Sequence, residues 1–149
     1  MKLFKKREYK SGSRWALWRW TYTPSGYITR LHVLKTPWFA VCLHYLNEPD
    51  PEAVLHDHPV TFLSLILRGG YSELRYVASH DAIFHRRHRW YNFIRATPDD
   101  RHTIVSVKPR TVTLALMGPK TREWGFHTRD GWVHWKTYND RKYKSGVQS

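Results

Sequence analysis

Short apolar segments of strand length, each ended by turn residues, follow one another along most of this chain. The segments 39–46 (FAVCLHYL), 61–67 (TFLSLIL) and 71–77 (YSELRYV) are the clearest, and Gly69-Gly70 between the last two is a hairpin signal. Further segments of this kind are 90–96, 103–107, 111–117, 123–127 and 132–138. Eight or more short strands at a spacing of roughly ten residues predict an all-β barrel or sandwich.

The length of 149 residues fits one domain, which we expect at residues 15–138. In residues 14–20 (RWALWRW), Trp15 and Trp18 are three positions apart, a spacing that predicts a short N-terminal helical segment. The two ends, 1–14 and 139–149, are basic and contain Ser and Gly, so we expect flexible tails there.

Several classes of protein are excluded by what the sequence lacks. No apolar run approaches the ~20 residues of a membrane-spanning helix. The charged N-terminus has no apolar stretch behind it, which argues against a signal peptide. Cys42 is the only cysteine, so an internal disulfide and a cysteine-based zinc cluster are excluded. We therefore expect a cytoplasmic protein.

The net charge of +13 is concentrated at the two ends of the chain. Residues 1–14 hold six basic residues and one acidic residue, and residues 136–149 hold four and one, so the ends carry eight of the thirteen net charges. This distribution predicts non-specific attraction to nucleic acid or another polyanion, with solubility as the alternative role. A second basic segment with an aromatic neighbour is either a contact for single-stranded nucleic acid or a solvated loop. It consists of Arg86, Arg87, Arg89 and Trp90.

His56 and His58 lie on either side of one aspartate, directly before an expected strand. In extended backbone, residues i and i+2 point to the same side, so the two imidazoles would converge as a chelating pair. A third ligand has to come from another strand. His102 is the best candidate because it begins the segment 103–107 after the turn at Pro98. The spacing therefore predicts a metal site of three histidines.

These residues resemble the motifs of the cupin superfamily, whose members are small β-barrels with an internal metal site. The first cupin motif is His-x-His, three or four residues, Glu, six residues and Gly. Here His56 and His58 are followed at that spacing by Phe62 and Gly69. The segment from Pro98 to His102 resembles the second motif, with one residue fewer and no Gly. The resemblance implies a double-stranded β-helix, or jelly-roll, barrel in which Phe62 replaces the acidic ligand.

A narrower resemblance is to a group of small cupin-like proteins of bacteria and their phages. It rests on four patterns, His56-Asp-His-Pro, Gly69-Gly-Tyr, Arg122-Glu-Trp-Gly-Phe and Gly131-Trp. The similarity extends over residues 30–136. For a phage-encoded protein the expected compartment is the host cytoplasm.

The ligand set implied by the resemblance, His56, His58 and His102, leaves a divalent metal its full charge and open coordination positions. Such a set suits Fe(II), which we expect first, and also Zn(II), Ni(II) or Cu(II), rather than Mg²⁺ or Ca²⁺, which prefer oxygen. It resembles the iron site of the thiol dioxygenases in ligand count. The alternative is an empty barrel whose centre is filled by Phe62. His44 is either a further ligand or pocket acid–base group, or a hydrogen-bonded core histidine.

The segment 71–77 places Tyr71, Glu73 and Arg75 on one face. If that face is inward, Glu73 can orient a ligand histidine, and Glu73 and Tyr71 are the candidate catalytic groups. Arg75 and Arg122 are candidates for holding an anionic substrate, with a surface ion pair as the alternative for Arg122. The Trp124 ring either stacks on a ligand or packs one end of the barrel.

Three functions remain open from the sequence. The first is a metalloenzyme, dioxygenase-like or zinc-dependent, that acts on a small anionic molecule. The second is a barrel that captures a small anionic ligand, such as a nucleotide signal, without turning it over, as a phage would use against host defence. The third is a nucleic-acid-associated protein that makes contact through its basic tails. A homodimer is compatible with each of them.

Overall fold

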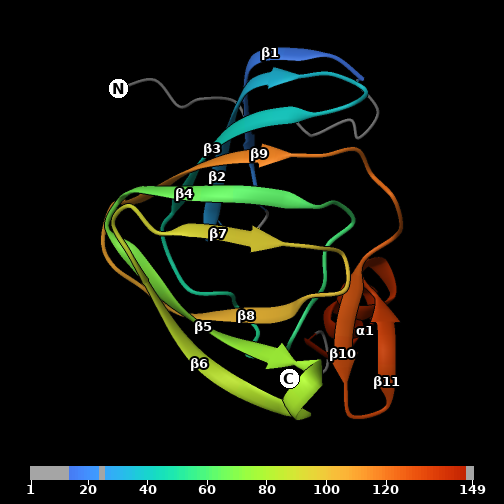
Figure 1. Ribbon diagram of the computed structural model, residues 1–149. Helices are drawn as coiled ribbons and strands as arrows, with labels where there is room; N and C mark the ends of the chain where they lie inside the picture. The colour runs from blue at the N-terminus through green and yellow to red at the C-terminus, as the bar shows by residue number, and fades with distance from the viewer. Residues whose placement is uncertain (1–13, 24–25, 147–149) are drawn as a thin grey trace.

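The computed structural model describes residues 14–23 and 26–146, which form two curved β-sheets with a hairpin and a helix at one end (Figure 1). The larger sheet has the order β1-β2-β3-β9-β4-β7. Its strands are β1 (Ala16–Tyr22), β2 (Ile28–Lys35), β3 (Ala40–Leu46), β9 (Thr111–Met117), β4 (Phe62–Arg68) and β7 (Phe93–Ala96).

The smaller sheet has the order β6-β5-β8, and a hairpin of two strands lies beyond it. These elements are β6 (Ala82–Arg89), β5 (Gly70–Val77), β8 (Arg101–Val107), β10 (Gly125–Thr128) and β11 (Gly131–His134). A 3₁₀ turn (Ala78–His80) joins β5 to β6, and α1 (Trp135–Gly146) follows the hairpin. The expected all-β architecture is thus confirmed.

The expected helical segment at the N-terminus is wrong, because residues 16–22 form β1. This strand pairs antiparallel with β2, with Leu17 opposite Leu34 and Trp20 opposite Leu31. The tryptophans that suggested a helix are exposed, and Trp20 contacts the ring of Tyr45 at 5.7 Å. Aromatic residues favour strands where a neighbouring strand is available for pairing. Here the pairing with β2 stabilises the extended conformation more than one helical turn would stabilise a helix.

The single α-helix among the described residues is C-terminal, and it packs on the hairpin. The Trp135 ring stacks on Trp124, and the Tyr138 ring stacks on Phe126 at 4.1 Å. The Tyr138 hydroxyl also donates to Glu52. Residues 139–146, placed in the C-terminal tail by the sequence, belong to this helix, whereas 1–13 of the N-terminal tail lie outside the described residues. No helix in the described part of the chain is long and apolar enough to span a bilayer.

Gly69-Gly70 does not form the expected hairpin. Strand β4 pairs with β7 and β9, whereas β5 pairs with β6 and β8, so the glycines carry the chain from one sheet into the other, at the bend on the left of Figure 1. Both have positive φ (77° and 149°), and a Cβ on Gly69 would lie 2.4 Å from Thr111 Oγ1. A sharp bend packed against Thr111, rather than strand pairing, requires these two residues.

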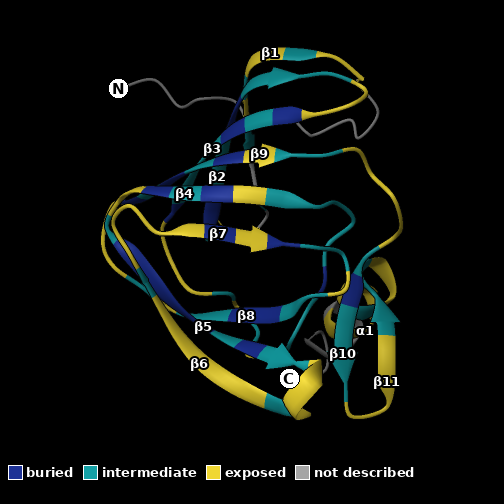
Figure 2. Cartoon of the chain, in the orientation of Figure 1, coloured by how far each residue is buried: buried dark blue, intermediate teal, exposed yellow. Residues whose placement is uncertain are grey.

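The buried residues, dark blue in Figure 2, include an apolar cluster and a group of small or polar side chains. The apolar cluster consists of Ile28, Leu46, Ile66, Tyr71 and Ile94. The buried positions of β3, β4 and β9 beside it are small or polar, namely Cys42, Ser64, Thr113 and Ala115. Burial raises the pKa of the Cys42 thiol to about 11. An interior lined with small or polar groups is unusual for a purely structural core and favours a binding cavity.

Candidate metal centre

Three histidines from two distant parts of the chain converge inside the barrel. One ring nitrogen each from His56, His58 and His102 lies within 4.8 Å of the others. The Nε2 atoms of His58 and His102 are 2.7 Å apart, and the His56 ring is 5.2 Å from that of His58 and 5.0 Å from that of His102. The structure thus brings the predicted third histidine to the pair, in an arrangement that could hold a metal ion.

The backbone around His56 explains this convergence. His56 N donates to His102 O at 2.9 Å and His102 N donates to His56 O at 3.0 Å, so His56 lies beside β8 like a strand residue. On its other side the same segment meets β10, where Asp57 N donates to Gly125 O at 3.1 Å. Extended backbone alternates its side chains, so His56 and His58 point inward together while Asp57 points to the hairpin.

Glu73 holds the His102 ring in place. This fully buried carboxylate accepts from His102 Nδ1 through Oε2 at 2.5 Å, and from His88 Nε2 and Arg75 Nε through Oε1 at 3.0 and 2.9 Å. Burial alone would raise the pKa of Glu73, but the hydrogen bonds from both histidines and the Arg75 charge outweigh it and hold the pKa well below its usual value. With Nδ1 held by an ionised carboxylate, His102 presents Nε2 to the other two histidines.

The pair from the His-x-His motif is neutral at physiological pH. Burial, followed by the neighbouring His102, lowers the pKa of His56 to about 3. Burial likewise lowers the pKa of His58 well below its usual value, with His102 and His56 adding to the effect. Neutral imidazole is the form that coordinates metal, so these rings compete little with protons for an ion.

Phe62 borders the histidines on the side where the cupin motif has glutamate. Its ring centroid is 5.0 Å from that of His58, in an edge-to-face arrangement. It therefore supplies an apolar wall to the site and no fourth ligand.

Asp57, which is not among the site residues expected from the sequence, is a hub that anchors the hairpin. Its side chain is 1% exposed and accepts from Gly125 N, Trp132 Nε1 and His127 Nε2 at 2.8, 2.9 and 3.0 Å. Arg122 Nη2 adds an ion pair at 2.8 Å. His127 therefore belongs to this structural network. The alternation around the two histidines indicates that Asp57 points away from them, but not which groups it meets.

The two arginines proposed from the sequence as an anion clamp both contact carboxylates. Arg75 is buried between Glu73 and Asp100, with its Nη1 donating to Asp100 at 3.1 Å. Arg122 pairs with Asp57 and Asp99 and lines a hollow of about 420 Å³ on the hairpin side. Tyr71 faces inward like Glu73 and Arg75, with its ring 5.1 Å from that of His88, and it belongs to the apolar cluster.

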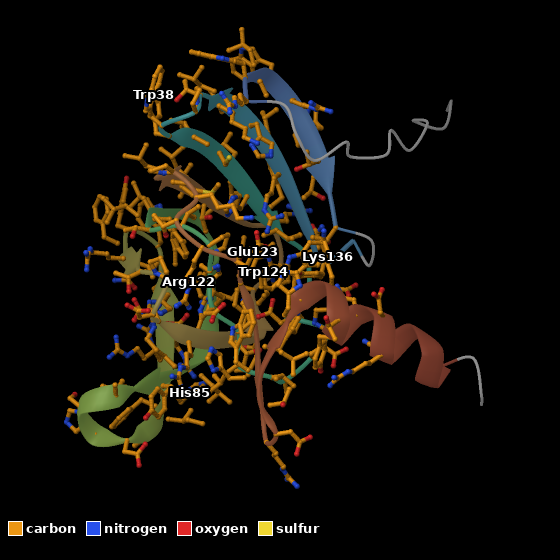
Figure 3. The ribbon with its side chains drawn as sticks, turned by 90° about the vertical axis from the view of Figure 1, so that its right-hand side faces the viewer. Trp38, His85, Arg122, Glu123, Trp124 and Lys136 are labelled. Atoms are coloured by element: carbon orange, nitrogen blue, oxygen red, sulfur yellow. The ribbon has the colours of Figure 1, made fainter. Side chains whose placement is uncertain are left out.

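Trp124 lies at the edge of the site and packs against the helix. Its ring centroid is 6.2 Å from that of His56, and it stacks on Trp135 at 5.7 Å with an interplanar angle of 8°. Figure 3 shows Trp124 near Arg122 and Glu123 on this face, close to Lys136 at the start of α1. The stacking on Trp135 is the packing arrangement, one of the two alternatives expected from the sequence.

The basic segment at Arg86, Arg87, Arg89 and Trp90 is a strand and its end rather than a loop. Strand β6 is paired on one side with β5, and the side chains of its three arginines and of Trp90, which follows it, are exposed. Figure 3 places the neighbouring His85 far from the Trp124 region. The strand pairing could not be read from the sequence, because HRRHR lacks the alternation of a half-buried strand.

Comparisons with known proteins bear on the fold. No protein-family model matches the chain, and no curated protein matches its sequence. Solved structures do match: KdgF from Halomonas sp. aligns with a TM-score of 0.54 and 16% identity over 69% of this chain and 89% of that one. A putative mannose-6-phosphate isomerase from Ralstonia eutropha JMP134 aligns with a TM-score of 0.52 and 16% identity over 62% of this chain and 84% of that one.

A third similar structure is Streptomyces albus HEPD with 2-hydroxyethylphosphonate and Fe(II) bound. It aligns with a TM-score of 0.53 and 13% identity over 72% of this chain and 24% of that chain. These structural neighbours are cupins. The chain therefore has the cupin fold, and its three histidines lie together inside that barrel.

Proposed function

We propose that this protein is a metal-dependent cupin that binds one divalent transition metal, foremost Fe(II), and acts on a small anionic molecule. The observation that carries the proposal is the convergence of His56, His58 and His102 within 4.8 Å of one another. Three imidazole ligands suit a catalytic site because they leave coordination positions open.

The residues present fit such an ion. Two of the histidines are neutral because their surroundings desolvate them, and the third is oriented by an ionised carboxylate through its other ring nitrogen. This is the arrangement that surrounding groups give to histidine ligands in metalloproteins. Zn(II), Ni(II) and Cu(II) accept the same donors.

The chain's own residues have distinct parts in this proposal. Bound Fe(II) would supply redox chemistry with dioxygen, and bound Zn(II) would supply Lewis acidity. Glu73 holds the proton at Nδ1 of His102, and Phe62 keeps water from one side of His58. An acid–base role of Glu73 or Tyr71 toward substrate stays a prediction.

Capture without turnover is the second candidate. The observation in its favour is that Glu73 already contacts His102, His88 and Arg75. Among the described residues, the other carboxylate beside the three histidines is Asp50, 3.8 Å from His56 Nδ1 and bonded to Ile104 N. Carboxylates that are already hydrogen-bonded to protein groups are poorly placed to transfer protons to a substrate. Such a site is therefore better suited to binding a ligand than to catalysis.

Elemental analysis and turnover separate these alternatives. We expect about one equivalent of transition metal per chain in wild type after reconstitution, and loss of it in His56→Ala, His58→Ala and His102→Ala. His85→Ala, an exposed histidine on β6, is the matched control and should retain the metal. Absence of metal from reconstituted wild type would refute the proposal. Loaded protein incubated with pooled metabolites would show mass changes if it is an enzyme, and an unchanged co-purifying metabolite if it captures.

A further inference from the structure

An arginine and a histidine face inward next to each other on the larger sheet, away from the carboxylates that pair with Arg75 and Arg122. Arg30 on β2 is directly opposite His44 on β3 in the strand register. On the other side of His44 the register continues to Thr113, which is buried. Residues paired in this way project from the same face of the sheet, so Arg30, His44 and Thr113 form a row across the interior.

His44 has an unused polar atom in this row. Its Nε2 is buried and has no hydrogen-bond partner. A buried nitrogen without a partner costs free energy, and native proteins rarely leave one unless a ligand or water meets it. Burial, followed by the charges of Arg30 and His32, lowers the pKa of His44 to about 3. The ring is therefore neutral and can donate one N–H.

Arg30 supplies an uncompensated positive charge. No carboxylate among the described residues lies within ion-pairing distance of its guanidinium, in contrast to Arg75 and Arg122. Arg30 faces the same interior as His44, because the two residues are paired in the register of β2 and β3.

We infer that Arg30 and His44 form the subsite that holds the anionic group of the ligand, a carboxylate or a phosphate, in the same barrel interior as the three histidines. The inference rests on the proposed function for the identity of the neighbouring site and replaces Arg75 and Arg122 as the anion clamp. A guanidinium offers two parallel donors to either oxyanion, and the neutral imidazole adds a third from the side.

Calorimetric titration of the metal-free protein with inorganic phosphate and with malonate tests this directly. We expect wild type to bind at least one of the two anions. Arg30→Gln should weaken that binding by at least tenfold, Arg30→Lys by less, and His44→Phe by several-fold. Arg95→Gln removes an equal charge from an exposed position on β7 and should leave the affinity unchanged. In wild type, anion binding should also shift the ¹⁵N resonance of His44 Nε2.

The outcomes distinguish the subsite from the metal site. Circular dichroism and thermal unfolding establish that each variant is folded. If Arg30→Gln does not fold, Arg30→Lys still tests the role of the guanidinium. The inference would be overturned if both Arg30 variants bound the anions with wild-type affinity, or if wild type bound neither anion. In either case, metal uptake would still support the proposed function. Anion binding that depends on Arg30 in a protein that takes up no metal would support the subsite and refute the metal proposal.

Discussion

At the scale of single residues, Glu73 is the side chain that links the histidine cluster to the rest of the barrel. Its two oxygens contact His102, His88 and Arg75, and it is fully buried. A ligand histidine whose other nitrogen is held in this way loses rotational freedom before the metal arrives. The orientation of His102 is therefore a property of the fold rather than of the ion.

Glu73→Gln should weaken metal binding by about 10- to 100-fold, because the neutral amide holds the His102 tautomer and orientation less firmly. Competition with a chelator of known affinity measures the change. Glu123→Gln is the matched control, since that carboxylate is exposed and pairs with Lys120 and His134 away from the site. Equal metal affinity in wild type and Glu73→Gln would show that the carboxylate does not orient the ligand.

His32 gives the fold a dependence on pH that does not involve the candidate ligands. Its ring contacts Cys42 Sγ at 3.1 Å and Thr21 Oγ1 at 3.2 Å. Burial, followed by the charges of Lys35 and Arg30, lowers its pKa to about 4. Between pH 6.5, where an unfolded histidine titrates, and about 4, the unfolded chain binds the proton and the folded chain does not. The stability of the fold should therefore fall as the pH falls through this window.

Urea unfolding at a series of pH values between 7 and about 4 measures the effect. His32→Gln should show a shallower loss of unfolding free energy on acidification than wild type, whereas His80→Gln, at an exposed position, should follow the wild-type slope. Identical slopes for wild type and His32→Gln would contradict the assignment.

Much of the site could be predicted from the sequence, because the chemistry that carries it is local. The spacing of His56 and His58 determines that their rings share a side, and the turn at Pro98 predicts where His102 begins its strand. Arg30 could not be found in the same way. Its relation to His44 exists only through the register of two paired strands, and nothing in either segment determines that register.

At the scale of elements, the bend between β4 and β5 is the feature that turns two sheets into a barrel. Gly69 occupies a left-handed conformation against Thr111, whose hydroxyl donates to Gly70 O at 2.9 Å. The Thr111 oxygen also accepts from Gly70 N at 3.0 Å. One threonine therefore holds the bend closed at the point where the chain changes sheets.

Gly69→Ala should destabilise the protein by several kcal/mol, because the new methyl meets Thr111 and the backbone is strained, each costing about 1–3 kcal/mol. Gly26→Ala is the matched control. Gly26 has nearly the same φ, 76° against 77°, and nothing within 4 Å of an added Cβ, so only the backbone cost of about 1–2 kcal/mol applies. Thermal or urea unfolding compares the two, and equal losses would show that the packing against Thr111 is unimportant.

The elements also show where prediction from the sequence failed. A glycine pair between two apolar segments predicts a hairpin if the segments pair with each other, yet here each segment pairs with strands from elsewhere in the chain. The helix expected at the N-terminus is wrong for a similar reason. The three-residue spacing of its tryptophans is a local signal, whereas the pairing of this segment with β2 is a tertiary one.

At the scale of the whole molecule, the distribution of charge leads us to propose weak, non-specific binding of nucleic acid. Replacing Lys5, Lys6, Arg7 and Lys10 by Gln in the full chain should lower the affinity for random duplex DNA. It should also reduce the slope of log affinity against log salt by roughly 0.9 for each phosphate that the variant no longer neutralises. Fluorescence anisotropy over a range of salt concentrations measures both quantities.

The companion variant replaces Arg86, Arg87 and Arg89, which are exposed on β6, by Gln. We expect it to keep most of the affinity and most of the salt slope. If this variant loses binding while the N-terminal variant retains it, the DNA-binding surface lies on the barrel, next to the exposed ring of Trp90, and single strands should then be preferred over duplex.

The reactivity of the single cysteine of the chain reports how often the barrel opens. Cys42 is 0% exposed on β3, which is paired on both sides by β2 and β9. Because the thiol is fully buried, a reagent reaches it only when the structure opens locally, and its raised pKa slows the reaction of the closed state further. The rate of labelling in native conditions therefore measures how often the barrel opens. A compound that binds the closed interior slows that rate in proportion to its occupancy, so a screen for the natural ligand can be run on this one atom without knowing the reaction.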